Sequence, residues 1–224
     1  MHSVAQKGFA IIPDVFCDAE VAALLCEIEN ADARRSRAGL RHAMRIPAVA
    51  QFANHQRLLN LAREVLGPGA FAFRATLFAK SPDANWLVVW HQDTALPLRE
   101  HHNLPGWGPW SVKEGILYSH APAEVLNQVL ALRIHLDDST AKNGCLRVIP
   151  STHTLDVFSD KQVEKLTHDR EQVECTARRG GVLAMRPLLV HASSKSHDRT
   201  ARRVLHIEYA AASAMARGIE LAIA

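Results

Sequence analysis

A series of short apolar segments rich in β-branched residues fills residues 70–211, and this series most constrains the fold. Each segment has the length and composition of a β-strand, and turn signals such as Asn143-Gly144, typical of a two-residue hairpin, separate several of them. The predicted strands are 70–79, 87–91, 128–136, 146–149, 173–177, 182–185, 188–191 and 202–211. Because no helix alternates regularly with these strands, they predict an antiparallel sandwich or jelly roll rather than a parallel sheet.

Helical patterns precede and interrupt the strands. Apolar residues recur at intervals of three and four in 18–33 and again in 49–66, where Gly67-Pro68-Gly69 ends the pattern. A third helix is predicted over 159–168, whose first residues have the spacing of a capping box. We therefore expect a mainly β protein with flanking α-helices packed on one face.

The 224 residues are expected to form a single domain. Residues 1–69 would be its helical support, and residues 70–224 its β core. The stretch 94–125 is the longest without a strand pattern, and we expect it to form a loop that covers the active site, with an ordinary surface loop as the alternative. Its Trp107 and Trp110 fit core packing and substrate contact equally well.

Charge and composition predict a small-molecule partner. The chain has 26 lysine and arginine residues against 23 aspartate and glutamate residues, a net charge of +3. The basic residues are scattered, so we expect neither a nucleic-acid partner nor a membrane partner. A basic loop at 34–42 is interpreted as a solvated connector, with an anion-attracting rim as the alternative. The sequence does not predict an oligomeric state.

The cysteines and the apolar runs predict a cytoplasmic protein. Cys17, Cys26, Cys145 and Cys175 lie far apart and form no CxxC pair, which argues against a zinc knuckle and a redox centre. No apolar run approaches the roughly 18 residues that span a bilayer, and the N-terminus lacks the apolar core of a signal peptide.

The first motif whose side chains could bind a metal is His91-Gln92-Asp93, which follows an apolar run from Trp86 to Trp90. In an extended chain, residues i and i+2 point to the same side. The imidazole of His91 and the carboxylate of Asp93 can therefore converge, while Gln92 turns away. Trp86 and Trp90 alternate on one face and are expected to lie in the core.

A second motif surrounds His191, which ends another predicted strand. If the polar run 193–200 is a hairpin turn, Arg202 lies opposite His191 on the following strand. Arg203 is the competitor of Arg202, because strand alternation can point either side chain inward. The spacing from His191 favours Arg202.

Two histidines and one carboxylate on a β scaffold form the facial triad of non-haem Fe(II) oxygenases. This triad leaves three coordination positions open, of which a 2-oxo acid can take two and dioxygen one. A nearby arginine provides a bidentate clamp for the distal carboxylate of such a cosubstrate. The predicted site therefore has His91, Asp93 and His191 as metal ligands and Arg202 as a cosubstrate ligand.

These motifs resemble a known family. The triplet at His91, the segment from Asn143 to His153 (NGCLRVIPSTH) and the eleven-residue spacing from His191 to Arg202 are similar to the phytanoyl-CoA dioxygenase family of Fe(II)/2-oxoglutarate-dependent oxygenases. The resemblance spans nearly the whole chain. It implies a double-stranded β-helix, the cupin-like jelly roll, with Fe(II) at the triad and the 5-carboxylate of 2-oxoglutarate on Arg202.

The resemblance also implies further cosubstrate-binding residues. Ser193, two residues after the distal histidine, matches a position that contacts 2-oxoglutarate in relatives. Thr76 and Arg133 match positions that line the cosubstrate pocket. Arg133 departs from the family pattern, in which an aromatic residue stands there, and could form a second carboxylate clamp or face the substrate.

The activity implied by the resemblance is hydroxylation of a small molecule by O2, with release of succinate and CO2 from 2-oxoglutarate. Asp93 favours this outcome over halogenation, since related halogenases have a glycine at that position. Two other functions fit the sequence. One is a metal-dependent cupin enzyme that uses no 2-oxoglutarate and does not need Arg202, and the other is a non-catalytic β-helix that binds a metal or ligand. The substrate, and the choice among hydroxylation, desaturation and ring closure, stay open.

The remaining polar residues near the predicted strands are expected to have structural roles. We interpret His135, His153 and His206 as hydrogen-bonded residues of the core or of the surroundings of the site rather than extra ligands. Lys80 and Lys113 are expected to be solvated, with a place in the lining of the pocket as the alternative for either.

Overall fold

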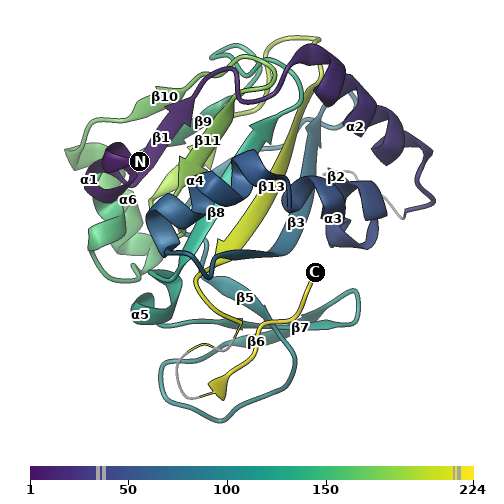
Figure 1. Ribbon diagram of the computed structural model, residues 1–224. Coiled ribbons are helices and arrows are strands. Elements are labelled where there is room, and N and C mark those ends of the chain that lie inside the picture. Colours follow the sequence, from purple (N-terminus) through teal and green to yellow (C-terminus); the bar gives the residue numbers. More distant parts are fainter. Residues whose placement is uncertain (34–35, 37–38, 214, 216–217) are drawn as a thin grey trace.

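Two facing antiparallel sheets form the centre of the computed structural model, which describes residues 1–33, 36, 39–213, 215 and 218–224 (Figure 1). This arrangement is the predicted jelly roll. The larger sheet contains, in spatial order, β1 (Phe9–Ile12), β11 (Val182–Met185), β8 (Val129–His135), β13 (Arg202–Ala210), β3 (Phe71–Lys80) and β2 (Gly39–Leu40). The smaller sheet contains β10 (Val173–Cys175), β9 (Leu146–Val148), β12 (His191–Ser193) and β4 (Val88–His91).

Helices cover the outer face of the larger sheet. They are α2 (Asp18–Asn30), α3 (Pro47–Ala53) and α4 (Gln56–Leu66), and α3 and α4 cross in front of β8, β13 and β3 in Figure 1. The predicted apolar stripe of α2 is buried at all four positions, which are Val21, Leu24, Leu25 and Ile28. The amphipathic pattern therefore identified both the helix and the face that packs inward.

Apolar side chains also fill one side of the space between the two sheets, under β1 and β11. Leu183 and Met185 of the larger sheet pack there with Leu146 and Val148 of the smaller sheet. Burial of this apolar surface holds the two sheets face to face. The other side of the same space, under β13 and β3, contains most of the polar side chains and is described below.

The prediction of one continuous helix over 49–66 is wrong, because two helices occupy this region. α3 ends at Ala53, and α4 starts at Gln56 after an extended His55, whose Nδ1 accepts a hydrogen bond from the Arg57 amide at 3.2 Å. Both helices turn apolar residues inward, so their apolar spacing alone does not reveal the break. The predicted end at Gly67 is confirmed, since this residue adopts φ 92°.

The other helices are α1 (His2–Lys7), α5 (Ala123–Leu126) and α6 (Asp160–Asp169), with 3₁₀ turns at Ala43–Arg45 and Thr152–Thr154. The capping box predicted for α6 is confirmed: the Ser159 amide donates to Oε1 of Gln162 at 2.9 Å. The N-terminal segment is not purely helical as expected, because β1 and β2 join the two edges of the larger sheet. Among the described residues, no helix is both long and apolar enough to span a membrane.

The loop predicted over 94–125 is wrong. This stretch forms a third sheet, with the order β5 (Ala95–Leu98), β7 (Ile116–His120) and β6 (Trp110–Lys113), followed by α5. The strands are short, and Pro97 lies inside one of them, so the sequence shows little strand pattern. A tight turn at Glu114 and Gly115, both with positive φ, joins β6 to β7.

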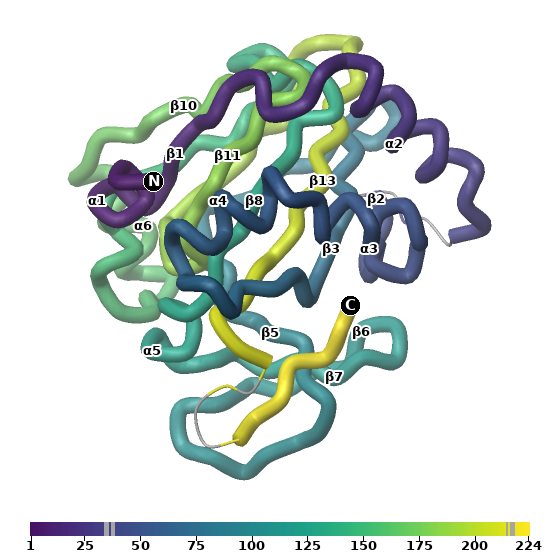
Figure 2. The backbone as a smooth tube through the Cα atoms, in the orientation of Figure 1, coloured from purple at the N-terminus to yellow at the C-terminus, as the bar shows by residue number. Residues whose placement is uncertain are grey.

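The third sheet lies below the two main sheets in Figure 2, beside the C-terminal segment of the chain. Trp107 and Trp110 pack against an apolar cluster that includes Leu96 and Leu221. Of the two expected roles, core packing and substrate contact, the structure supports core packing for both. None of the described residues of 94–125 lines the cavity described below, and the role of this stretch as a cover stays a prediction.

The hairpin predicted between His191 and Arg202 is wrong as well. A strand was predicted over 188–191, but β12 begins at His191 and ends at Ser193. It pairs with β4 and β9 of the smaller sheet. β13 pairs with β3 and β8 of the larger sheet. The polar run 194–201 therefore crosses from one sheet to the other. Asn143-Gly144 likewise lies between strands of different sheets and is not a hairpin turn.

We predict that Tyr209→Phe lowers the free energy of unfolding by about 1–2 kcal/mol. The buried Tyr209 hydroxyl donates to the carbonyl of Ala53, the last residue of α3, at 2.7 Å. Removing the hydroxyl leaves this carbonyl without its donor and loosens α3 on the sheet. Urea unfolding followed by circular dichroism measures the change, and an unaltered midpoint with an unaltered slope would contradict the prediction.

Candidate metal centre

A cavity of about 230 Å³ opens on the polar side of the space between the two main sheets. Strand alternation directs every second residue of β3 into it, from Arg74 to Lys80. The facing sheet contributes the ends of β4 and β12. The other side chains that line the cavity are Arg41, Trp86, Val88, His91, Asp93, Arg133, Leu146, His191, Ser193, Arg202 and His206.

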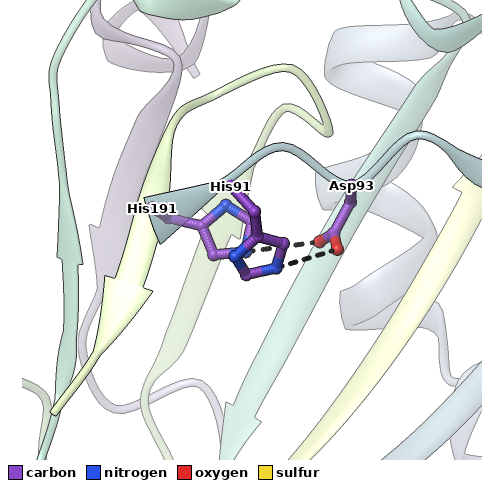
Figure 3. A group of neighbouring side chains, drawn as sticks. All are labelled: His91, Asp93 and His191. Carbon is purple, nitrogen blue, oxygen red and sulfur yellow. Dashed lines mark ion pairs between the residues drawn. The ribbon is translucent and has the colours of Figure 1, made fainter. Parts of the chain in front are cut away.

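Three of these side chains form the predicted triad (Figure 3). His91 ends β4 and His191 begins β12, and the two residues are direct partners in the antiparallel ladder. Their ring centroids are 4.3 Å apart. Asp93 follows β4 and points between the rings, with Oδ1 at 3.6 Å from Nε2 of His91 and Oδ2 at 3.5 Å from Nε2 of His191.

Backbone contacts orient both imidazoles. Nδ1 of His91 is 2.8 Å from the carbonyl of Val89, and Nδ1 of His191 is 2.8 Å from the carbonyl of Leu189. A carbonyl only accepts, so each Nδ1 carries the proton and each Nε2 keeps its lone pair. Both lone pairs face the Asp93 carboxylate, and the three ligand atoms lie within 4.8 Å of one another.

Charge and burial set the protonation of this donor set. Burial lowers the pKa of His191 to about 4, so this ring is neutral at pH 7. Burial alone would raise the pKa of Asp93 and lower that of His91, but the attraction of the two histidines brings the Asp93 pKa well below its ordinary value, and the attraction of Asp93 raises the His91 pKa. A neutral imidazole and an ionised carboxylate are the forms that bind a metal ion.

Gln92 turns away from the triad, as predicted, and its side chain bonds to two other segments of the chain. Its Nε2 donates to the carbonyl of Leu188 at 2.8 Å, and its Oε1 accepts from the amide of Phe158 at 2.8 Å. The Asp93 amide donates to the carbonyl of Pro187 at 2.9 Å. The segment with His91 and Asp93 is thereby joined to the turn that leads into His191.

Arg202 lies in the cavity, although the predicted hairpin that would have placed it there does not exist. It begins β13 and faces Ser193 across the space between the sheets, with a guanidinium nitrogen 3.3 Å from Ser193 Oγ. Arg203 points to the other side, where it pairs with Asp137 and Glu29. Within the described residues, Arg202 is buried without a carboxylate partner, and its Nε makes no hydrogen bond.

Thr76 and Arg133 lie in one cross-strand row with His206 between them. A guanidinium nitrogen of Arg133 donates to Nδ1 of His206 at 2.9 Å, and the group lies over the ring of Phe78. Burial and the neighbouring Arg133 charge hold the pKa of His206 well below its ordinary value, so this ring is a neutral acceptor. Arg133 also lacks a carboxylate partner in the described part of the chain, and its Nε is unbonded.

Sequence reasoning missed several residues of the cavity. Lys80 was expected to be solvated, but only 1% of its surface is exposed, and Trp86 lines the cavity where core packing was expected. The sequence did contain a signal for Lys80: it lies four residues after Thr76 on one predicted strand region, and residues at even spacing on a strand point to the same face. Arg74 forms a buried ion pair with Glu208 at the same wall.

The other predicted roles have mixed outcomes. His135 and His153 are buried and hydrogen-bonded, to Ser139 Oγ and to the Ala5 carbonyl respectively, and do not belong to the triad. Lys113 is partly buried over the ring of Tyr118 rather than solvated. Residues 34, 35, 37 and 38 of the predicted basic loop lie outside the described residues, while Arg41 of that loop lines the cavity.

Comparison with known proteins agrees with this geometry. A sequence model of the family "Phytanoyl-CoA dioxygenase (PhyH)" matches residues 4–204. An ectoine dioxygenase of Bordetella parapertussis is 25% identical over 169 residues, which cover 68% of this chain and 48% of the relative. The chain thus spans about half the length of the curated relatives it matches.

Solved structures share the fold. AviO1 from Streptomyces viridochromogenes Tue57 superposes with a TM-score of 0.68 at 21% identity, covering 93% of this chain and 92% of that one. SnoN, a non-heme alpha ketoglutarate dependent epimerase from nogalamycin biosynthesis, superposes with a TM-score of 0.71 at 18% identity, covering 96% and 82%. At these identities the likeness concerns the fold alone.

We predict that Gln92→Ala weakens Ni(II) or Co(II) binding roughly tenfold to a hundredfold, because residues that orient metal ligands have effects of that size. Calorimetric titration of the purified protein measures the affinity. Gln172→Ala is the matched control, since Gln172 is exposed and its partners among the described residues, Arg147 and Thr167, do not belong to the site. Equal affinities of the two variants would show that the Gln92 contacts do not support the site.

Proposed function

The chain belongs to the phytanoyl-CoA dioxygenase family, and on this premise we propose that it is an Fe(II)- and 2-oxoglutarate-dependent dioxygenase that hydroxylates a small molecule. One observation supports this proposal above the others. The cavity that contains the His91, Asp93 and His191 cluster also contains Arg202, a buried guanidinium without a carboxylate partner among the described residues. A metal site and an anion site thus share one small space.

The donor set suits Fe(II). Two imidazole nitrogens and one carboxylate oxygen form the facial triad typical of non-haem iron oxygenases, and both Nε2 atoms are free to coordinate. His91, Asp93 and His191 would hold the ion. The chemistry that iron supplies in such a site is activation of dioxygen coupled to oxidative decarboxylation of the 2-oxo acid.

The side chains around the triad bind and orient the cosubstrate in this proposal. Arg202 would take the distal carboxylate of 2-oxoglutarate, since a guanidinium and a carboxylate form two parallel hydrogen bonds. Arg133, with Thr76 beside it in the same row of side chains, would add a second positive group along the cosubstrate. Ser193 would position Arg202 through its hydroxyl.

The apolar side chains of the cavity restrict water near the metal. Phe78, Trp86, Val88 and Leu146 line it together with the charged groups. Exclusion of water strengthens the electrostatic interactions inside and limits side reactions of an oxidising intermediate. A small organic molecule placed against these residues would meet the open side of the metal site.

The relatives support the reaction class and leave the outcome open. The ectoine dioxygenase is an oxygenase by name, whereas SnoN is an epimerase. Hydroxylation and epimerisation diverge only after a substrate hydrogen is removed, so one site can serve either. We propose hydroxylation, with O2 as co-reactant and succinate and CO2 as products.

The two alternative functions are less well supported. A metal-dependent cupin without 2-oxoglutarate does not need Arg202, and a non-catalytic binding module does not need a metal triad and a buried arginine in one cavity. Burying an unpaired guanidinium is costly, so its retention here favours a ligand that carries a carboxylate.

We predict that anaerobic addition of Fe(II) followed by 2-oxoglutarate produces the weak visible charge-transfer band of the metal-bound 2-oxo acid. Neither addition alone should produce it, because the band requires both partners on one site. Absorption spectroscopy under nitrogen measures the band. Folded protein that binds iron but shows no band would exclude the proposed dioxygenase.

We predict that His191→Ala and Arg202→Ala fail in different ways. His191→Ala removes a ligand and should abolish stoichiometric metal binding. Arg202→Ala should bind metal normally but bind 2-oxoglutarate roughly tenfold to a hundredfold more weakly, as expected for loss of a charged hydrogen bond. Calorimetry with Ni(II) and then 2-oxoglutarate separates the two effects, and identical behaviour of the variants would refute the assigned roles.

A further inference from the structure

Lys80 is a buried cation that the proposed function does not use. It is the last residue of β3 and follows Arg74, Thr76 and Phe78 on the face that lines the cavity. In the described part of the chain, no carboxylate lies within ion-pair distance of its ammonium, which contacts only serine oxygens. A buried charge without a counter-charge is unfavourable unless a ligand provides one.

The contacts of the ammonium leave one position that a ligand can take. Nζ donates to Ser193 Oγ at 2.7 Å and to the Ser194 carbonyl at 2.5 Å. The third contact, to the Ser193 carbonyl, is 3.4 Å long and therefore weak. An oxygen of an incoming anion can replace this contact while the other two hold the side chain in place.

The Ser193 hydroxyl connects Lys80 to Arg202. It accepts from Lys80 at 2.7 Å and from Arg202 at 3.3 Å, and it donates its proton to the carbonyl of Gly144 at 2.8 Å. A hydroxyl has one proton and two lone pairs, so all of its capacity is used. In this arrangement Ser193 has no proton to offer a carboxylate. The donors available to an anion here belong to Lys80 and Arg202.

The loop with Gly144 packs tightly against Ser194 and the Lys80 ammonium. A Cβ on Gly144 would lie 2.4 Å from the Ser194 carbonyl oxygen and 3.4 Å from Lys80 Nζ, and φ is +74°. Only glycine fits such a position without displacing the chain. The ring of Trp86, with its centroid 5.5 Å from Nζ, lies over the ammonium. Lys80 is therefore held from three sides.

Like charges from neighbouring strands surround the ammonium. Arg202 of β13 is its direct partner in the ladder, and Arg133 approaches from β8. Burial and these two charges lower the pKa of Lys80 to about 7, and the Cys145 thiol acts in the opposite direction. Burial raises the pKa of the Cys145 thiol to about 11, so the thiol supplies no negative charge at neutral pH.

We propose that Lys80 binds the distal carboxylate of the cosubstrate together with Arg202, and thereby selects 2-oxo dicarboxylic acids over 2-oxo monocarboxylic acids. The assignment rests on the proposed function, because it needs the 2-oxo acid end of the ligand at the triad. The two cations share Ser193 as a common anchor and face the same cavity. The carboxylate supplies the counter-charge that this wall of the cavity lacks.

The test compares two ligands that differ only at the distal end. 2-Oxoglutarate and 2-oxobutanoate both present a carboxylate and a keto group to a metal, but only the first has a distal carboxylate. Each is titrated calorimetrically into Ni(II)-loaded protein without oxygen. We expect Lys80→Met to weaken 2-oxoglutarate binding roughly tenfold to a hundredfold and to leave 2-oxobutanoate binding within about twofold. Lys80→Arg should restore most of the affinity.

Lys161→Met is the matched control. Lys161 is an exposed lysine of α6 and does not line the cavity. Its loss should change neither titration. An equal loss of affinity for both ligands in Lys80→Met would mean that Lys80 only supports the fold of the site, and no loss for either would mean that it does not contact the ligand.

A measurement on the unmodified protein covers the case in which Lys80→Met does not fold. Burial and the charges of Arg202 and Arg133 lower the pKa of the Lys80 amine to about 7, and a neighbouring carboxylate would raise it again. Binding of 2-oxoglutarate should therefore take up a proton, which titrations in buffers of different ionisation enthalpy detect, whereas 2-oxobutanoate should take up none. Equal proton uptake with both ligands would overturn the proposal.

The outcomes separate this proposal from the proposed function. If the metal-loaded protein binds neither 2-oxo acid, the dioxygenase proposal fails and the role of Lys80 fails with it. If both ligands bind with equal affinity, the triad accepts 2-oxo acids but the distal site does not exist. If 2-oxoglutarate is preferred and Lys80→Met keeps that preference, Arg202 alone is responsible and only the assignment of Lys80 is wrong.

Discussion

The direct pairing of His91 with His191 in the ladder between β4 and β12 is the constraint on which the site depends. Antiparallel partners place their side chains on the same face, so the register alone brings the two imidazoles together. A slip by one residue would send one ring to the opposite face of the sheet. The side chain of Gln92 and the amide of Asp93 hold the segment around this pair, which makes the register hard to change.

The space between the sheets has two chemical characters, and the division follows the strand order of the larger sheet. β1 and β11 face the smaller sheet with apolar residues such as Leu183 and Met185, whereas β13 and β3 carry charged side chains that line the cavity. β8 lies between them, and its Arg133 is the ladder partner of Leu183. The apolar core thus lies directly beside Arg133 and Arg202, which have no carboxylate partner among the described residues, and it supports the cavity without a separate scaffold.

The sequence predicted features that local patterns determine, and it missed features that depend on how the chain crosses from one sheet to the other. The alternation in His91-Gln92-Asp93 and the apolar stripe of α2 are local patterns, and both appear as expected. The hairpin prediction brought Arg202 near His191 by the wrong route, because local periodicity does not reveal that the chain crosses to the other sheet. Lys80 was misjudged for a related reason: a lysine is ordinarily solvated, and only the facing serines make its burial possible.

The sheet formed by β5, β7 and β6 has a consequence for synthesis of the protein. Its apolar side, which includes Leu96 and Trp107, is packed by Ile219 and Leu221, and the Ala222 amide bonds to the carbonyl of Pro97. These partners leave the ribosome long after the sheet itself. A nascent chain therefore exposes two tryptophans and their neighbours until Ile219 and Leu221 have been synthesised, and this interval is when it is most open to aggregation and to chaperone binding.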